Sequence, residues 1–155
     1  MIQRIQTLYL LVVAALSAVM LFVPLAWFAT GEAGEFELHA FALESVGGET
    51  LHSTVYLGIL LTAASLLPLI TLFLYRRRLL QIRLCCVEMV LLLGVLAMEG
   101  VYYYLGCRAF SELAFHSQGF KPAIALPLVS LSFVVLAAKA IFRDELLVRD
   151  ADRIR

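Results

Sequence analysis

Two glutamates inside a long apolar stretch, Glu88 and Glu99, are the residues whose type and position point most directly to chemistry. Ionisable side chains are rare inside membrane segments, where they mark proton relays and ion pathways. The two glutamates are 11 residues apart. Along a helix this spacing is about three turns, or about 16 Å, so both carboxyl groups share one face. A proton or cation relay along that face is therefore one hypothesis for these residues.

A structural role explains the same residues, and we favour it. Lys139 lies in the next apolar stretch, at the depth expected for Glu88, and we expect an ion pair between the two. We expect Glu99 to be a protonated or tyrosine-bonded carboxyl group that faces other helices. A relay usually needs an ionisable group near the middle of the membrane as well, and the spacing places neither glutamate there. Glu88, Glu99 and Lys139 together form the predicted intramembrane polar site.

Other reactive residue types do not form a known pattern. The glutamates of residues 29–53, with His39 and His52, have the spacing of no metal motif, so we expect a solvated acidic loop and no metal or cofactor. The three cysteines include no Cys-x-x-Cys pair, and a helix separates Cys107 from the other two, so we expect no internal disulfide. The chain has no nucleophile elbow, P-loop or dinucleotide turn, and we expect a protein that is not an enzyme.

The composition is that of a membrane protein. Hydrophobic residues make up 63% of the 155 residues and charged residues 15%, whereas soluble domains have about 45–50% and about 25%. The excess lies in four stretches of about 20 residues, each long enough to cross about 30 Å of hydrocarbon. We predict helices at about 8–28, 54–75, 84–105 and 122–142. The expected fold is all-α, a single membrane domain (1–155) built as a bundle of four transmembrane helices.

A basic connector at 76–83 sets the predicted orientation. It contains Arg76, Arg77, Arg78 and Arg83. In the four-helix layout all but two of the 12 lysines and arginines fall on the side of this connector. Positive residues favour the cytoplasmic side, so both termini are predicted to be cytoplasmic. The same arginines are candidates for contact with anionic lipid head groups. The expected partners are therefore membrane lipids and not nucleic acid.

The remaining segments lie outside the predicted membrane helices. Residues 29–53 and 106–121 are predicted to be external loops, and part of the first alternates between polar and apolar residues. This alternation favours a small hairpin, although an irregular loop remains an alternative. The first apolar stretch is longer than a signal-peptide core, so we expect a retained helix. The tail, 143–155, has no glycine or proline and is predicted to continue the fourth helix into the cytoplasm.

This tail is the predicted site of contact with a partner. Its charged candidates are Asp144, Glu145, Arg149, Asp152 and Arg153. Glu145 and Arg149 have the favourable i,i+4 order for a helical ion pair.

Both ends of the chain carry a resemblance. Residues 1–10 (MIQRIQTLYL) and 139–155 (KAIFRDELLVRDADRIR) resemble an uncharacterised four-pass membrane protein family of the Bacteroidetes group of bacteria, a domain of unknown function. The resemblance implies a bacterial inner (cytoplasmic) membrane location and a retained first helix. It implies no activity, cofactor or catalytic residue.

Three functions are compatible with these observations. We favour a non-enzymatic accessory or scaffold subunit that binds a membrane-protein partner, because the clearest sequence features lie at the cytoplasmic ends. The alternative is a small oligomeric transporter or channel that uses Glu88 and Glu99. A membrane-embedded lipid enzyme ranks last, because all three histidines fall in the external loops.

Overall fold

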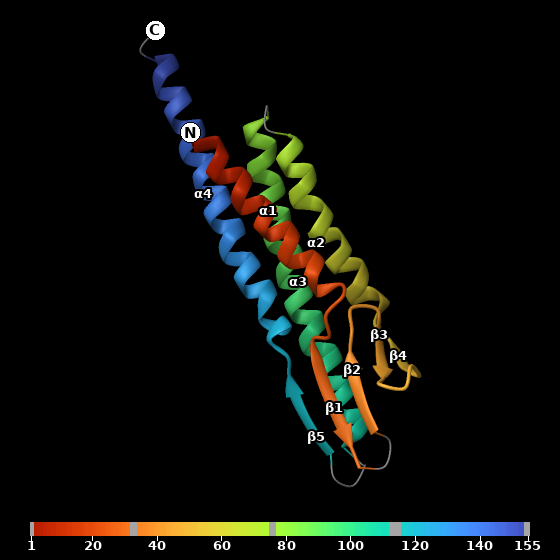
Figure 1. Ribbon diagram of the computed structural model, residues 1–155. Coiled ribbons are helices and arrows are strands. Elements are labelled where there is room, and N and C mark those ends of the chain that lie inside the picture. Colours follow the sequence, from red (N-terminus) through yellow and green to blue (C-terminus); the bar gives the residue numbers. More distant parts are fainter. Residues whose placement is uncertain (1, 32–33, 75–76, 112–115, 154–155) are drawn as a thin grey trace.

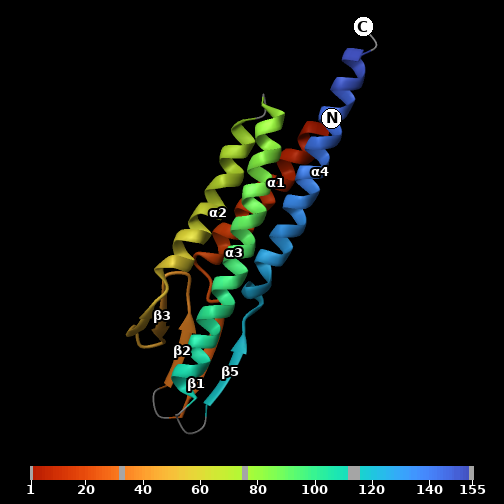
Figure 2. The ribbon, with the colours of Figure 1, turned by 180° about the vertical axis from the view of Figure 1, so that it is seen from behind.

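The structure, a computed structural model, describes residues 2–31, 34–74, 77–111 and 116–153. Within these ranges four α-helices pack side by side and a five-stranded sheet lies at one end (Figures 1 and 2). The helices are α1 (Ile2–Met20), α2 (Val55–Phe73), α3 (Arg78–Phe110) and α4 (Leu126–Arg153), with a short 3-10 helix, η1 (Pro122–Ala125), before α4. The strands are β1 (Ala26–Thr30), β2 (Gly34–Leu38), β3 (Ala42–Ser45), β4 (Thr50–Ser53) and β5 (His116–Phe120).

The predicted all-α fold is wrong, because the chain has a mixed α/β fold. The strands form one antiparallel sheet in the order β4-β3-β2-β1-β5. Four of them come from the segment between α1 and α2, and the fifth comes from the segment between α3 and α4. The sheet therefore joins two connectors that the sequence places far apart.

The sheet begins inside the segment predicted as the end of the first helix. α1 ends at Met20 rather than at 28, and Pro24 follows one turn later, where a proline cannot continue a helix. The backbone of Leu25 then pairs with both sides of the sheet. Its N–H donates to the carbonyl of Leu38 (2.7 Å), and its carbonyl accepts from the N–H of Lys121 (3.0 Å). The apolar residues after Pro24 thus extend into a central strand.

One face of the sheet is apolar and the other is polar. β1 buries alternate residues, among them Phe28, which lies opposite Phe36 of β2 and Gln118 of β5. The glutamates of β2 and β3 alternate with the buried residues and so point away from the apolar face. This alternation gives the sheet one side that packs on helices and one side that meets water.

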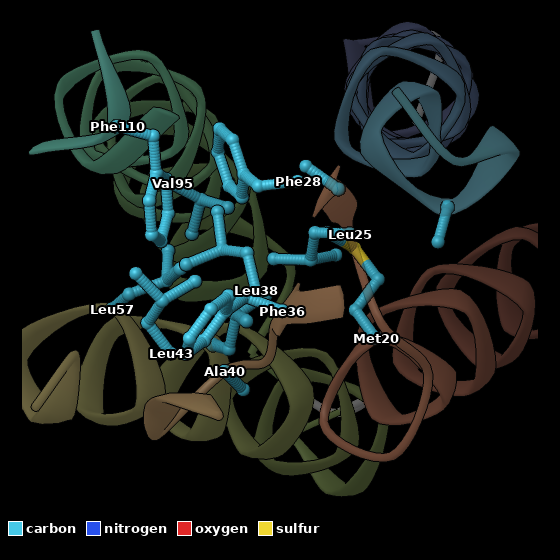
Figure 3. Close-up of a cluster of buried hydrophobic side chains, with 13 residues drawn as sticks. Met20, Leu25, Phe28, Phe36, Leu38, Ala40, Leu43, Leu57, Val95 and Phe110 are labelled. Carbon is cyan, nitrogen blue, oxygen red and sulfur yellow. The ribbon is translucent and has the colours of Figure 1, made fainter. Parts of the chain in front are cut away.

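Two clusters of buried apolar side chains hold the fold together. The cluster nearer the sheet contains buried residues of the first three strands, of α1, α2 and α3, and of η1. Figure 3 shows its side chains turned toward one another between α3, α2 and the sheet. Phe28, Phe36 and Phe110 stack there with ring centroids 5.0–5.6 Å apart. The second cluster lies among the helices alone. Its members are Leu10, Val13, Ala64, Cys85, Leu92, Val134, Ala137 and Ile141.

Three of the described helices are long and apolar enough to cross a membrane. These segments are Val55–Phe73, Leu79–Phe110 and Pro122–Val148, while the apolar part of α1, Ile5–Met20, is shorter. Only 28–39% of the residues in the most apolar part of each segment are buried within the chain. Large apolar side chains such as Phe73 and Val90 are exposed. The outer surface of the helices therefore suits hydrocarbon better than water.

The third helix links the two parts of the molecule. α3 has 33 residues and is about 50 Å long at 1.5 Å per residue, longer than the roughly 30 Å of a hydrocarbon core. Its last turns lie against the apolar face of the sheet (Figures 1 and 2). Both termini, the end of α2 and the start of α3 lie at the opposite end.

Candidate functional site

The buried face of α3 carries the residues that stand out chemically. Its buried positions alternate in steps of four and three residues, so they form one straight row along the helix. Between residues 81 and 99 they are, in chain order, Gln81, Cys85, Glu88, Leu92, Val95 and Glu99. Glu88 lies between two members of the helical cluster, and Glu99 follows Val95 of the sheet-side cluster.

The carboxyl groups of Glu88 and Glu99 have no hydrogen-bond partner. Each residue is 2% exposed, and all four carboxyl oxygens are buried without a donor or acceptor. The predicted ion pair between Glu88 and Lys139 is wrong, because the Lys139 residue is exposed on α4 and neither Glu88 oxygen is bonded. The predicted tyrosine bond to Glu99 is not formed either. A buried polar group without a partner costs about 1–3 kcal/mol, so these two positions are unfavourable for the isolated chain.

Apolar residues separate the two carboxyl groups along α3. Leu92 and Val95 lie between them on the same row, and both are fully buried. The buried face of α3 therefore carries two separate carboxyl groups with no polar side chain between them on that face.

Two serines share this property and had no signal in the sequence. Ser17 of α1 and Ser130 of α4 are fully buried, and neither hydroxyl has a hydrogen-bond partner. Hydroxyl groups in helices usually bond to a carbonyl of the preceding turn. Thr62 and Thr71 of α2 do so, with bonds of 2.7 Å and 2.8 Å. A sequence shows which residues have a hydroxyl group, but not which of them lack this local bond.

Two buried glutamines fasten the helices at the end that carries the termini. Gln6 of α1 donates from Nε2 to the carbonyl of Ala140 in α4 (3.1 Å). Gln81 of α3 donates from Nε2 to the carbonyl of Thr71 near the end of α2 (3.0 Å). Side-chain bonds between helices are worth more where the surroundings are apolar, so these contacts fix the relative position of neighbouring helices.

The predicted lipid contact lies at the same end. Arg77 and Arg83 are exposed there. Arg76 lies outside the described residues, and Arg78 begins α3 but its side chain is not described. Both residues lie near the start of α3, and their contact with lipid stays a prediction.

The predicted partner contact lies on the last turns of α4. Asp144 and Glu145 are half-buried. Arg149, Asp152 and Arg153 are in the helical backbone, while their side chains lie outside the described part of the chain. The predicted partner-contact residues therefore all belong to α4, the helix that also contains the fourth apolar segment.

The opposite end has an ion pair on the polar face of the sheet. Lys121, just after β5, bonds to the carboxylate of Glu37 in β2, and His39 Nε2 lies 3.4 Å from the other oxygen of that carboxylate. The Lys121 ammonium holds the pKa of Glu37 below its usual range. No group of three or more metal-ligating side chains occurs within the described ranges.

A comparison with protein families identifies the chain. The model of a family described as a domain of unknown function (DUF4293) matches residues 2–154. The chain belongs to the DUF4293 family. The match includes the helices, the sheet and the tail, so the DUF4293 domain is the whole fold described above. A search of curated proteins found no match to the chain.

Proposed function

We propose that this DUF4293 protein is an integral protein of the inner membrane of a bacterium of the Bacteroidetes group, and that it acts as a non-enzymatic accessory or scaffold subunit. Three helices long enough to span a bilayer support the membrane location. α1 packs beside α2 and α4, and its 19 residues extend about 28 Å, so we infer that it crosses the bilayer with them. The basic end with both termini is then cytoplasmic, and the sheet is external.

The observation that carries the scaffold role is the length of α4. Its last turns pass beyond the start of α1, the end of α2 and the start of α3 (Figures 1 and 2). Leu146, Leu147 and Val148 lie on this extension and are 42–52% exposed. They follow the charged residues Arg143, Asp144 and Glu145, which suit the membrane boundary. An apolar helix surface beyond the boundary is a contact site for another protein, in keeping with a membrane-protein partner.

Native mass spectrometry after gentle detergent extraction tests this role. We expect the full chain to retain a partner protein, and we expect that mass to be lost when residues 144–155 are deleted or when Leu147→Asp is introduced. The matched control is Val46→Asp, which places the same charge at an exposed apolar position (69% exposed) at the other end of the molecule. Retention of every bound protein by the tail variants would contradict the proposal.

A second candidate function is ion or proton transport by a homo-oligomer, and the unpartnered carboxyl groups favour it. Leu92 and Val95 separate Glu88 from Glu99 along α3, so transport would require polar groups from elsewhere, such as a neighbouring copy, to complete the pathway. Proton flux into liposomes that contain the purified protein tests this function. Flux that Glu99→Gln abolishes, and that Glu35→Gln on the exposed face of the sheet leaves unchanged, would support transport. No flux would reject it.

A further inference from the structure

A cavity of about 750 Å³ lies between the last turns of α3 and the outer strands of the sheet. Its walls come from β2, β3 and β4 on one side and from residues 102–110 of α3 on the other. Small-molecule sites in proteins have volumes of about 300–1,000 Å³ and mostly apolar walls. The walls here are largely apolar, including Leu38, Leu43, Leu105 and Ala109. Its size and walls are therefore those of a ligand site.

A bulge in the sheet contributes to this cavity. The register between β3 and β4 shifts at Leu43 and Glu44, so that Leu43 pairs with His52 and Glu44 pairs with Thr50. Leu51 is the additional residue. In a regular strand, consecutive side chains point to opposite faces. Here Leu51 and His52 both line the cavity. A bulge redirects side chains in this way, and it also makes the edge of β4 a poor template for another strand.

The charge at the cavity is positive. Arg108 lines it from α3 and is exposed, and no acidic side chain is among the described lining residues. The carboxylate of Glu37 lies on the other face of the sheet, where it is bonded to Lys121. Thr54 also lines the cavity, but its hydroxyl donates to the carbonyl of His39 (3.0 Å). Arg108 is thus the charged group that a ligand head would meet.

The position of the cavity along α3 is that expected for the surface of a membrane. About 20 residues of helix cross the hydrocarbon core. Counted along α3 from Arg83, the exposed arginine at the basic end, this length ends near Tyr103. Tyr102 lines the cavity, and the other lining residues of α3 follow it toward the sheet. In the membrane location proposed above, the cavity therefore lies where lipid head groups meet the outer ends of acyl chains.

We propose that this cavity binds the acyl chain of a single-chain anionic amphiphile, such as a fatty acid, with its negative head group on Arg108. The apolar walls suit the chain, and the guanidinium suits a carboxylate or phosphate head. The bulged edge of β4 argues against a polypeptide strand as the occupant. This binding goes beyond the scaffold role and does not depend on the tail of α4, so each can fail without the other.

Photolabelling of the full chain tests the proposal. The protein is placed in nanodiscs of zwitterionic phosphatidylcholine, and the probe is palmitate with a diazirine near the end of its chain. After illumination, mass spectrometry of peptides locates the label. We expect the label to be concentrated in residues 102–110 and 43–52, well above the level at exposed apolar residues of α2 such as Leu66 and Phe73. Unlabelled palmitate should compete, and hexadecanol, which has the same chain without a charge, should compete far less.

Two substitutions and their controls sharpen the test. Arg108→Gln removes the charge at an exposed site and should weaken competition by palmitate about tenfold. Arg143→Gln, at an exposed position of α4 far from the cavity, should have no effect. Ala109→Trp should fill the cavity and abolish the concentrated label. Ala97→Trp, at an exposed position about three turns earlier on α3, should not. If Ala109→Trp does not fold, Arg108→Gln decides the result.

Three outcomes would overturn the proposal. The first is a label spread evenly over the apolar outer surface of the helices. The second is equal competition by palmitate and hexadecanol, or wild-type competition in Arg108→Gln. The third is an unlabelled cavity together with slowed hydrogen exchange in β4 caused by a co-purified polypeptide, which would assign this face to a protein partner.

Discussion

The helical part and the sheet place their polar groups in opposite ways. In the helical part the outer surface is apolar, with Phe73 at 77% exposure, while Glu88 and Glu99 are buried without partners. In the sheet the apolar face is turned inward. Its exposed face carries Glu37, which is paired with Lys121. One chain thus contains an arrangement suited to hydrocarbon next to one suited to water.

This difference indicates that different forces hold the two parts together. The sheet buries Phe28 and Phe36 against α3, and removal of such apolar area from water is the main favourable term in folding. In the proposed membrane location the helices gain little from this term, because lipid is as apolar as their side chains. Close packing and bonds such as that from Gln81 to Thr71 must then hold them together. Substitutions should therefore have different effects in the two parts.

The largest expected effect is at the contact between the sheet and α3. Phe110 is 4% exposed and stacks on both Phe28 and Phe36. Phe110→Ala should lower the free energy of unfolding by about 3–5 kcal/mol, because it leaves a cavity between α3 and two strands. The control is Phe22→Ala, at a position 80% exposed after α1, which should change stability by less than about 0.5 kcal/mol. Denaturant titration of the purified protein measures both, and equal effects would contradict the proposed contact.

The next effect has the opposite sign and concerns the helical part. Glu99→Leu replaces an unpartnered buried carboxyl group with an apolar side chain of similar size. It should raise the free energy of unfolding by about 1–3 kcal/mol. Glu35→Leu, on the exposed face of β2, should change it by less than about 0.5 kcal/mol. Destabilisation by Glu99→Leu would show that the carboxyl group has a favourable partner in the membrane, such as a second copy of the chain.

The sequence predicts the helices better than the sheet, for a physical reason. α2 covers Val55–Phe73, inside the predicted 54–75, because a long apolar stretch bounded by polar residues has few alternative structures. β1 and β5 pair Trp27 with Gly119, residues that are far apart in the chain. Such a pairing leaves no local pattern. Residues 26–30 are as apolar as the helix before them, and β5 has little alternation.

In the candidate site too, the features set by one helix were predicted and those set by packing between distant segments were not. The spacing of Glu88 and Glu99 places both on one face of α3, and both are buried there. The pairing with Lys139 fails because it depends on the rotation of α4 about its own axis, which turns that lysine outward. The cavity was not predicted at all, since it needs the bulge between β3 and β4 and the extension of α3 to Phe110. These features arise only when distant segments pack together.

The smallest expected effect is the pH dependence of the sheet. Lys121 lowers the pKa of Glu37 in the folded protein, so the pair stabilises the fold at pH values above the ordinary carboxyl pKa. This contribution is lost as the pH falls through the lowered pKa, where the carboxylate takes up a proton. Lys121→Met should therefore reduce stability at neutral pH by about 0.2–1 kcal/mol, the range for partly exposed ion pairs, and have almost no effect in acid.

Thermal unfolding of the two proteins between pH 3 and pH 7 measures this difference. The curves should converge on the acid side and separate as the pH rises. Arg83→Met provides the control, because it removes a positive charge from the helical end and leaves the sheet unchanged. Its curve should stay parallel to that of the wild type through the carboxyl range. A constant difference in stability between wild type and Lys121→Met at every pH would show that Lys121 acts through packing and not through its charge. The stability of the sheet would then not depend on a charge pair, and this contrast with the helical part would fail.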